Sequence, residues 1–238
     1  MRHEREGKNM KFDRRISRRS FLAAAGVSAA ALALTACGGS SSTAASGSTA
    51  ASGAAASAEG GVLNVMLETE VQSLDPQLAT DGTSFEVIAN YTDGLMQMDA
   101  NGAAVEALAE SYELVNDTDF VFKLREDAVW SDGTPVTAND VKFTFDRAKN
   151  MPKTKSNTSK VKEVVVDNEH QVTIKLTEPY APFKSIVANS NLSIVQEAAV
   201  TAAGEAYGDA DNAVGSGPFT VKEWVPNDHY TCLLYTSD

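Results

Sequence analysis

The fold of this chain is decided by residues 120–141, which read FVFKLREDAVWSDGTPVTANDV. Phe120, Phe122 and Leu124 fall on alternate positions, which is typical of a strand with one buried face. Asp, Gly and Pro gather in residues 130–135, and these residue types favour a reversal of the chain. The stretch therefore begins with a strand that runs into a tight turn.

The same stretch ends in a predicted helix. Thr137 is followed three residues later by Asp140, a pattern that is typical of a first helical turn. Val141, Phe145 and Ala148 then share one helical face, which we expect to pack on the sheet.

Further elements are predicted on both sides. Upstream, residues 62–67 form an apolar run that favours a strand, and Thr83 with Glu86 resembles a capping box for a helix that ends near Gly94. Downstream, residues 161–166 and 172–176 predict a hairpin that turns near Asp167-Asn168.

A helix is expected from about Gln196 to Tyr207, and residues 215–219 reverse the chain into a strand at about 220–224. Strands and helices mix without a regular βαβ order. The pattern therefore favours a mixed α/β fold.

The first 36 residues resemble an export signal. Arg18 and Arg19 precede an apolar run of 16 residues, Phe21 to Ala36, which is shorter than the roughly 20 residues that a spanning helix needs. The two arginines fit a twin-arginine signal, and an ordinary Sec signal with a basic head remains an alternative.

Cys37 follows Leu34, Thr35 and Ala36, and this run resembles a bacterial lipobox. We therefore expect cleavage before Cys37 and a lipid on its thiol. Residues 37–61 then carry the lipidated cysteine and a segment rich in Gly, Ser and Ala, which predicts a flexible tether. The chain is thus expected on the extracytoplasmic face of the cell membrane, or in the periplasm.

The charge is divided unevenly along the chain. Residues 1–36 hold eight basic and three acidic side chains, whereas the rest holds 12 basic and 29 acidic ones. Phosphate binding needs clustered Lys and Arg, so an acidic body argues against nucleic acid as a partner.

No catalytic or metal-binding pattern is present in the sequence. Ser216 lies between glycines, but a nucleophile elbow needs glycine two positions away on each side. His170 and His229 are expected on the surface, and Trp130 and Trp224 are expected to pack in or beside the core. We therefore predict no enzyme, no metal site and no cofactor.

The body resembles the extracellular solute-binding proteins of family 5, the oligopeptide- and dipeptide-binding components of ABC importers. Residues 120–141 carry the strongest likeness. Shorter matches follow the family's order: Ser73-Leu74-Asp75-Pro76, Tyr91 to Leu95, Leu108-Ala109-Glu110, Glu178 to Phe183 and Gly215 to Phe219.

This resemblance implies the N-terminal lobe of a two-lobe receptor that closes on its ligand by a hinge, with an inserted subdomain at about residues 99–193. It implies a peptide ligand, permease subunits as partners and a monomeric state. Members of the family are about twice this length, so residues 62–231 are expected to form a partial binding domain whose C-terminal lobe is missing. Residues 232–238 depart from the family pattern and are predicted to be a non-native tail.

Six residues are candidates for ligand contact. By the resemblance, the loop of Thr80, Asp81, Gly82 and Thr83 lines the cleft, and Asn189 with Asn191 marks the return from the inserted subdomain. Each has a structural alternative: Asp81 and Thr83 as helix caps, and the asparagines as turn residues.

Two alternatives to a peptide receptor remain at this stage. One is a receptor of the same fold for a nickel chelate, haem, sugar or opine. The other is a lipoprotein enzyme whose catalytic residues lie in the missing half.

Overall fold

The computed structural model describes residues 62–234, which belong to one compact unit. The predicted export signal, lipobox and tether, with Arg18, Arg19 and Cys37, lie outside the described residues.

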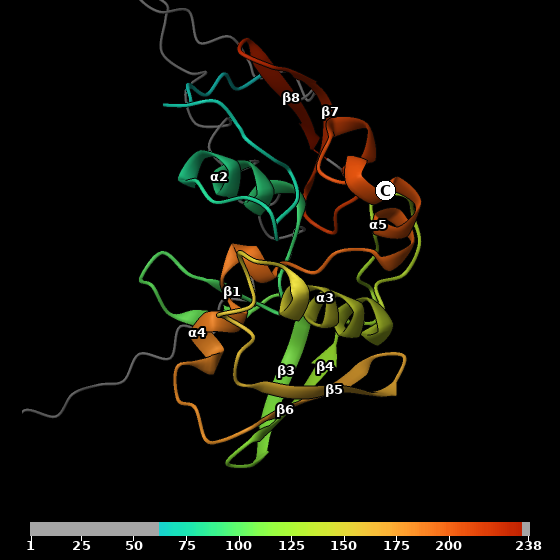
Figure 1. Ribbon diagram of the computed structural model, residues 1–238. Coiled ribbons are helices and arrows are strands. Elements are labelled where there is room, and N and C mark those ends of the chain that lie inside the picture. Colours follow the sequence, from blue (N-terminus) through green and yellow to red (C-terminus); the bar gives the residue numbers. More distant parts are fainter. Residues whose placement is uncertain (1–61, 235–238) are drawn as a thin grey trace, which may run out of the picture. The chain divides into compact units, whose positions relative to one another are not determined.

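A four-stranded antiparallel sheet forms the larger part of the fold (Figure 1). Its strands are β3 (Ala109–Asn116), β4 (Asp119–Leu124), β6 (Gln171–Leu176) and β5 (Val161–Asn168), in that spatial order. Helix α3 (Ala138–Asn150) lies across one face of this sheet.

The contact between α3 and the sheet confirms the prediction from residues 120–141. Phe122 and Leu124 of β4 are fully buried, and so are Val141 and Phe145 of α3. The Asp140 carboxylate accepts a hydrogen bond from the Thr137 backbone N–H at 3.0 Å and so closes the first turn of α3. Because strand, turn and helix are all specified locally, this region follows its sequence closely.

The turn between β4 and α3 is also confirmed. The Trp130 N–H donates to the Thr134 carbonyl at 2.8 Å, and the Gly133 N–H donates to the Trp130 carbonyl at 2.9 Å. Gly133 has a φ of 85°, which a side chain would strain. Trp130 itself is fully buried, so it is a core residue as predicted.

Short elements surround this core. Strands β1 (Met96–Met98) and β2 (Ala104–Glu106) form a small antiparallel ribbon. The later short helices are α4 (Phe183–Val187), η1 (Ser190–Leu192), α5 (Glu197–Ala203), η2 (Gly204–Ala206) and η3 (Ala210–Asn212).

A second apolar cluster joins α2 (Gly82–Tyr91) to the hairpin of β7 (Phe219–Val225) and β8 (His229–Leu234). Val87, Ile88 and Tyr91 are its buried centre. Gly215 and Gly217 bring the returning chain against Tyr91, and the Gly217 N–H donates to the Tyr91 carbonyl at 2.9 Å.

The predicted strand at residues 62–67 is wrong. These residues have no regular structure, and Val62, Leu63, Val65 and Met66 are between 69% and 94% exposed. A strand needs a neighbour to pair its backbone N–H and C=O groups, and none of the pairings within residues 62–234 involves this segment.

The predicted capping box of Thr83 and Glu86 is also wrong. A cap at Thr83 would start the helix at Ser84, whereas the helix begins two residues earlier, at Gly82, and Asp81 caps it. Helix α2 ends at Tyr91 rather than near Gly94, because Thr92 takes an extended backbone conformation.

Two further boundaries differ from the prediction. The hairpin turns at Glu169-His170, because β5 continues through Asp167 and Asn168. The helix expected up to Tyr207 breaks after Ala203, because Gly204 adopts a φ of 57°. His170 therefore lies in the turn of the β5–β6 hairpin, where it is half-buried. His229 is the first residue of β8 and is exposed, which confirms the surface position expected for it.

The end of the described chain continues the hairpin. Cys232 pairs with Val221, and Leu234 pairs with Phe219 across β7 and β8. That residues 232–238 are a non-native tail stays a prediction.

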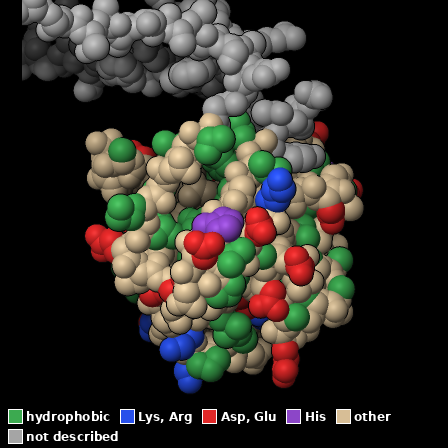
Figure 2. All heavy atoms as spheres, turned by 90° about the horizontal axis from the view of Figure 1, so that it is seen from above, with side chains coloured by type: hydrophobic (Ala, Val, Ile, Leu, Met, Phe, Trp, Pro, Cys, Tyr) green, Lys and Arg blue, Asp and Glu red, His purple; other side chains and the backbone are tan. Residues whose placement is uncertain are grey.

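The surface agrees with the acidic composition. Figure 2 shows a face where carboxylates are scattered among apolar side chains and basic side chains are few. Over residues 62–234, none of the helices has both the length and the apolar character required to cross a bilayer.

Candidate functional site

The loop before α2 separates into anchored and exposed residues. The Asp81 carboxylate accepts hydrogen bonds from the backbone N–H of Ser84 and from its hydroxyl, both at 2.8 Å. The capping alternative for Asp81 is thus confirmed. Thr80 and Gly82, which flank Asp81, are exposed.

Thr83 does not cap the helix, because it lies inside the first turn. Its hydroxyl is 2.7 Å from the hydroxyl of Thr69, and Gln72 donates its backbone N–H to the Ser84 hydroxyl at 2.9 Å. Segment 69–72 is therefore fastened to the start of α2. The loop presents Thr80 and Gly82 outward on a fixed support.

Asn189 and Asn191 both take part in turn structure. The side-chain oxygen of Asn189 accepts from the Asn191 backbone N–H at 3.2 Å, and the side-chain oxygen of Asn191 accepts from the Asn157 amide at 3.0 Å. The predicted site residues are not brought together. The loop of residues 80–83 precedes α2, whereas Asn189 lines a cleft with Thr92 and Asp93, beyond the other end of that helix.

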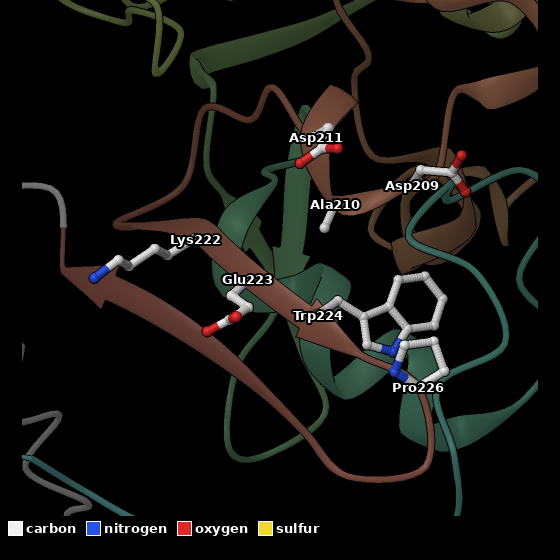
Figure 3. A pocket seen from close by; sticks show the side chains of 7 residues that line it. All are labelled: Asp209, Ala210, Asp211, Lys222, Glu223, Trp224 and Pro226. Atoms are coloured by element: carbon white, nitrogen blue, oxygen red, sulfur yellow. The ribbon is translucent and has the colours of Figure 1, made fainter.

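A surface hollow of about 640 Å³ lies between η3 and β7 (Figure 3). Asp209 and Asp211 line one side, and Lys222, Glu223 and Trp224 line the other. In Figure 3 the Trp224 indole extends toward Asp209, whereas Lys222 and Glu223 extend toward the opposite end. With three carboxylates and one ammonium group, the hollow favours ligands that carry positive charge.

The Trp224 side chain is fixed in this hollow by Glu70. One oxygen of the Glu70 carboxylate accepts from the indole N–H at 3.1 Å, and the other accepts from the Asn227 backbone N–H at 2.9 Å. Asn227 has a φ of 61° at the tip of the β7–β8 hairpin. Trp224 is half-buried, as expected for a residue that packs beside the core.

A smaller cleft of about 180 Å³ is bordered by α2, β1 and the turn after α4. Asp93 and Asn189 are among its lining residues. Burial raises the pKa of Asp93 to about 6, and the positive charge of Arg125 acts in the opposite direction. This carboxyl group is therefore poised to titrate near neutral pH.

A buried ion pair connects α3 to the segment before α2. Arg147 donates to both carboxylate oxygens of Asp75, at 3.0 and 2.6 Å, and also to the Gln77 side chain at 2.8 Å. Asp75 is completely buried, and the guanidinium lies 5.6 Å from the centre of the Tyr207 ring. Because all the carboxylate partners are internal, this cluster positions the fold rather than a ligand.

The described residues contain no group of three His, Cys, Asp or Glu side chains placed to hold a metal ion. The Ser216 hydroxyl accepts a hydrogen bond from the Asp93 backbone N–H at 3.1 Å, which is a structural contact. Neither hollow brings together a nucleophile and a base in the way that covalent catalysis requires.

Sequence reasoning missed Glu70 and Asp93. Glu70 acts on residues more than 150 positions away, and no local pattern reveals that contact. Asp93 lies within Tyr91 to Leu95, a segment noted only as a family likeness, and the only signal in the sequence was an acidic residue directly before Gly94 and Leu95.

Comparison with known proteins places these features in a family. The model for bacterial extracellular solute-binding proteins, family 5, matches residues 103–233. The periplasmic oligopeptide-binding protein OppA of Escherichia coli is 30% identical over 67% of this chain and 33% of its own length. The probable D,D-dipeptide-binding protein DdpA of the same bacterium is 35% identical over 67% of this chain and 34% of its own length.

Solved structures agree with these matches. OppA of Burkholderia pseudomallei has a TM-score of 0.66 at 28% identity, over 71% of this chain and 37% of that one. Peptide-bound OppA of Listeria monocytogenes has a TM-score of 0.60 at 31% identity, over 64% of this chain and 34% of that one.

The chain spans about a third of the length of the curated relatives it matches. Its mixed α/β fold is the one expected for part of a two-lobe binding protein. The family's members are solute-binding proteins rather than enzymes. On the match over residues 103–233, this chain belongs to the bacterial extracellular solute-binding proteins of family 5.

Proposed function

We propose that the chain is part of the substrate-binding component of an ABC importer, which captures peptides outside the cell and delivers them to a membrane permease. The observation that carries this proposal is the shared fold with the peptide-bound Listeria monocytogenes protein, at a TM-score of 0.60 and 31% identity. Relatives named for oligopeptide and dipeptide binding point to the same ligand class.

The loop before α2 is the proposed contribution of this chain to ligand contact. Asp81 and Thr83 are held by internal hydrogen bonds, so the exposed Thr80 and Gly82 need little reordering when a ligand arrives. Extended peptides are commonly held through their main chain, and the absence of a side chain at Gly82 leaves room for that approach. Asn189 and Asn191 remain candidates at a separate position.

The test is a thermal-shift measurement on the product of the complete gene, against peptides of two to five residues and a matched mixture of free amino acids. A ligand at 100 times its Kd stabilises the folded state by about 2.7 kcal/mol. We expect peptides to raise the melting temperature and free amino acids to leave it unchanged. Absence of a shift with every peptide would reject the peptide assignment.

A second ligand class is favoured by one specific relative. AgaA from Agrobacterium tumefaciens, solved with agropinic acid, has a TM-score of 0.64 at 28% identity. This likeness is as strong as that to the peptide-bound protein, so an opine-type ligand is the second candidate. A shift with agropinic acid and none with peptides would select it.

We also propose that the chain reaches its site through the export signal and is held on the membrane by lipid on Cys37. Relatives named as periplasmic proteins support an extracytoplasmic location. The acidic body gives little attraction to an anionic bilayer by itself, so a lipid anchor supplies the attachment.

A further inference from the structure

The cleft between α2, β1 and the turn after α4 holds a carboxylate with no partner. Across residues 62–234, the Asp93 side chain makes no hydrogen bond within 3.5 Å and no ion pair within 4.0 Å. Its backbone, in contrast, is fully engaged: the N–H donates to the Ser216 hydroxyl at 3.1 Å, and the carbonyl accepts from the Ile194 N–H at 2.9 Å. The backbone of Asp93 is thus fixed, and its carboxylate makes no direct contact with a donor or a cation among these residues.

The nearest cationic side chain is already engaged elsewhere. Arg125 donates to both carboxylate oxygens of Asp127, at 3.0 and 2.8 Å. It acts on Asp93 only as a more distant charge, and burial outweighs this effect because the pKa of Asp93 is raised to about 6. Asp93 is half-buried, and partial burial disfavours its ionised form. A cation in this cleft would therefore stabilise the carboxylate.

The other lining residues suit an ammonium group in particular. The cleft offers side-chain oxygens from Asn189, Ser190 and Ser193, and apolar surface from Ala89 and Met98. An ammonium group has three donors and no acceptor, so one can reach Asp93 while the others face neutral oxygens. A divalent metal needs more oxygen ligands, and no metal-binding group of side chains exists among residues 62–234.

The size of the cleft limits the ligand. Its volume is about 180 Å³, which is below the roughly 300–1,000 Å³ of sites for drug-sized ligands, so a small ligand fits it best. We propose that this cleft, the Asp93 cleft, is a binding site for a primary ammonium group on a short aliphatic chain. The site is separate from the loop of residues 80–83, although it includes Asn189, and a bound ammonium group goes beyond the proposed function.

The test is a chemical-shift titration of the isotopically labelled 238-residue chain with butylammonium chloride at pH 7.5. At this pH Asp93 is ionised and the amine is protonated. We expect saturable shifts confined to residues 89–98 and 188–193. The neutral isostere 1-butanol is expected to bind at least about tenfold more weakly, because it lacks the charge-assisted contact.

Three variants distinguish binding in the Asp93 cleft from nonspecific attraction of the cation to the protein surface. Asp93→Asn keeps the shape, removes the unpaired charge and should weaken butylammonium binding at least about tenfold. Ala89→Leu changes an exposed position of α2, narrows the cleft and should weaken binding with the charge intact. Glu106→Gln removes an exposed carboxylate from the neighbouring strand β2 and should change nothing.

Equal affinities for butylammonium and 1-butanol would overturn the proposal. So would unchanged binding in both Asp93→Asn and Ala89→Leu, or shifts that lie outside the cleft. None of these outcomes depends on peptide capture, so the two proposals fail independently.

Discussion

Asp81 and Thr80 are neighbours with different tasks, which a pair of substitutions can separate. Asp81 caps α2 through two hydrogen bonds at 2.8 Å, and the loss of such a cap costs about 1 kcal/mol. Asp81→Ala should therefore lower the free energy of unfolding in urea by about that amount. Thr80→Ala, at an exposed position, should leave stability unchanged and weaken ligand binding in the complete protein.

A loss of stability in Thr80→Ala that equals the loss in Asp81→Ala would contradict this division. Full ligand affinity in Thr80→Ala would remove Thr80 from the proposed binding loop.

Of the substitutions considered, replacement of Arg147 should lower the free energy of unfolding most. It neutralises Asp75, which is completely buried, and removing one partner of a buried pair costs about 3–5 kcal/mol. Arg147→Met keeps much of the apolar stem of the side chain. Its effect on stability therefore measures the cost of leaving the buried Asp75 carboxylate without its positive partner. We expect a drop of that size in the free energy of unfolding, measured by urea denaturation.

Lys175→Met is the matched control for that measurement. Lys175 pairs with Glu163 at 2.8 Å, but the two side chains are 36% and 48% exposed. An exposed pair contributes about 0–1 kcal/mol. Similar losses of unfolding free energy in the two variants would show that the buried Asp75–Arg147 pair stabilises the fold no more than an exposed pair does.

Among the elements, the segment that leads into β7 depends on a glycine that lies against α2. A Cβ atom at Gly215 would lie 1.8 Å from the Tyr91 carbonyl oxygen, so the backbone of α2 or of the returning chain must move. Gly215→Ala should therefore lower the free energy of unfolding by at least about 1–3 kcal/mol, the usual cost of overpacking.

Gly82→Ala provides the comparison. A Cβ atom there meets nothing within 4 Å, and Gly82 is the first residue of α2. Alanine should be neutral or stabilising by up to about 1 kcal/mol, because it restricts the unfolded chain. If both alanine variants unfold at the same urea concentration, then the close approach to Tyr91 carries no energetic weight.

The elements that sequence alone predicted are those specified by near neighbours. The strand at 120–124, the turn at 130–135 and helix α3 each carry their own periodicity, turn residues or cap. The strand expected at 62–67 failed because pairing depends on a distant partner, which no local pattern supplies. The helix expected up to Tyr207 failed because an alanine-rich pattern hides the backbone reversal at Gly204.

The candidate site was less predictable than the fold. The loop of residues 80–83 was found through family likeness, and its division into anchored and exposed residues needed the contact between Thr69 and Thr83. The Asp93 cleft joins two segments, residues 89–98 and 188–193, that lie about a hundred residues apart in the chain. The proposed preference of this cleft for an ammonium group depends on the Asp93 carboxylate having no partner among the described residues. The sequence alone does not show which side chains lie near Asp93.

At the scale of the whole molecule, the anchor prediction concerns the two cysteines. Two acyl chains on one residue give stable membrane attachment, whereas one chain binds only marginally. Cys37→Ser should therefore move the protein from the membrane fraction to the soluble fraction after export. Cys232→Ser, which changes the half-buried cysteine of β8, should leave it in the membrane fraction.

Mass spectrometry of the mature N-terminus supplies the direct check on the anchor. The expected species begins at Cys37 and carries a diacylglycerol group. An unmodified Cys37, or cleavage at another residue, would reject the anchor and leave family membership untouched.

The close approach of Asp93 and Ser216 has a consequence for how such a receptor evolves and can be engineered. The two residues are 123 positions apart, yet a hydrogen bond of 3.1 Å joins them. The intervening polypeptide therefore departs and returns at almost one point, as an inserted domain does. A bridge of a few residues would span that point, but Arg147 within the stretch neutralises the buried Asp75 outside it. Exchange with a homologous stretch should therefore keep the fold only where the homologue supplies an arginine at the position of Arg147.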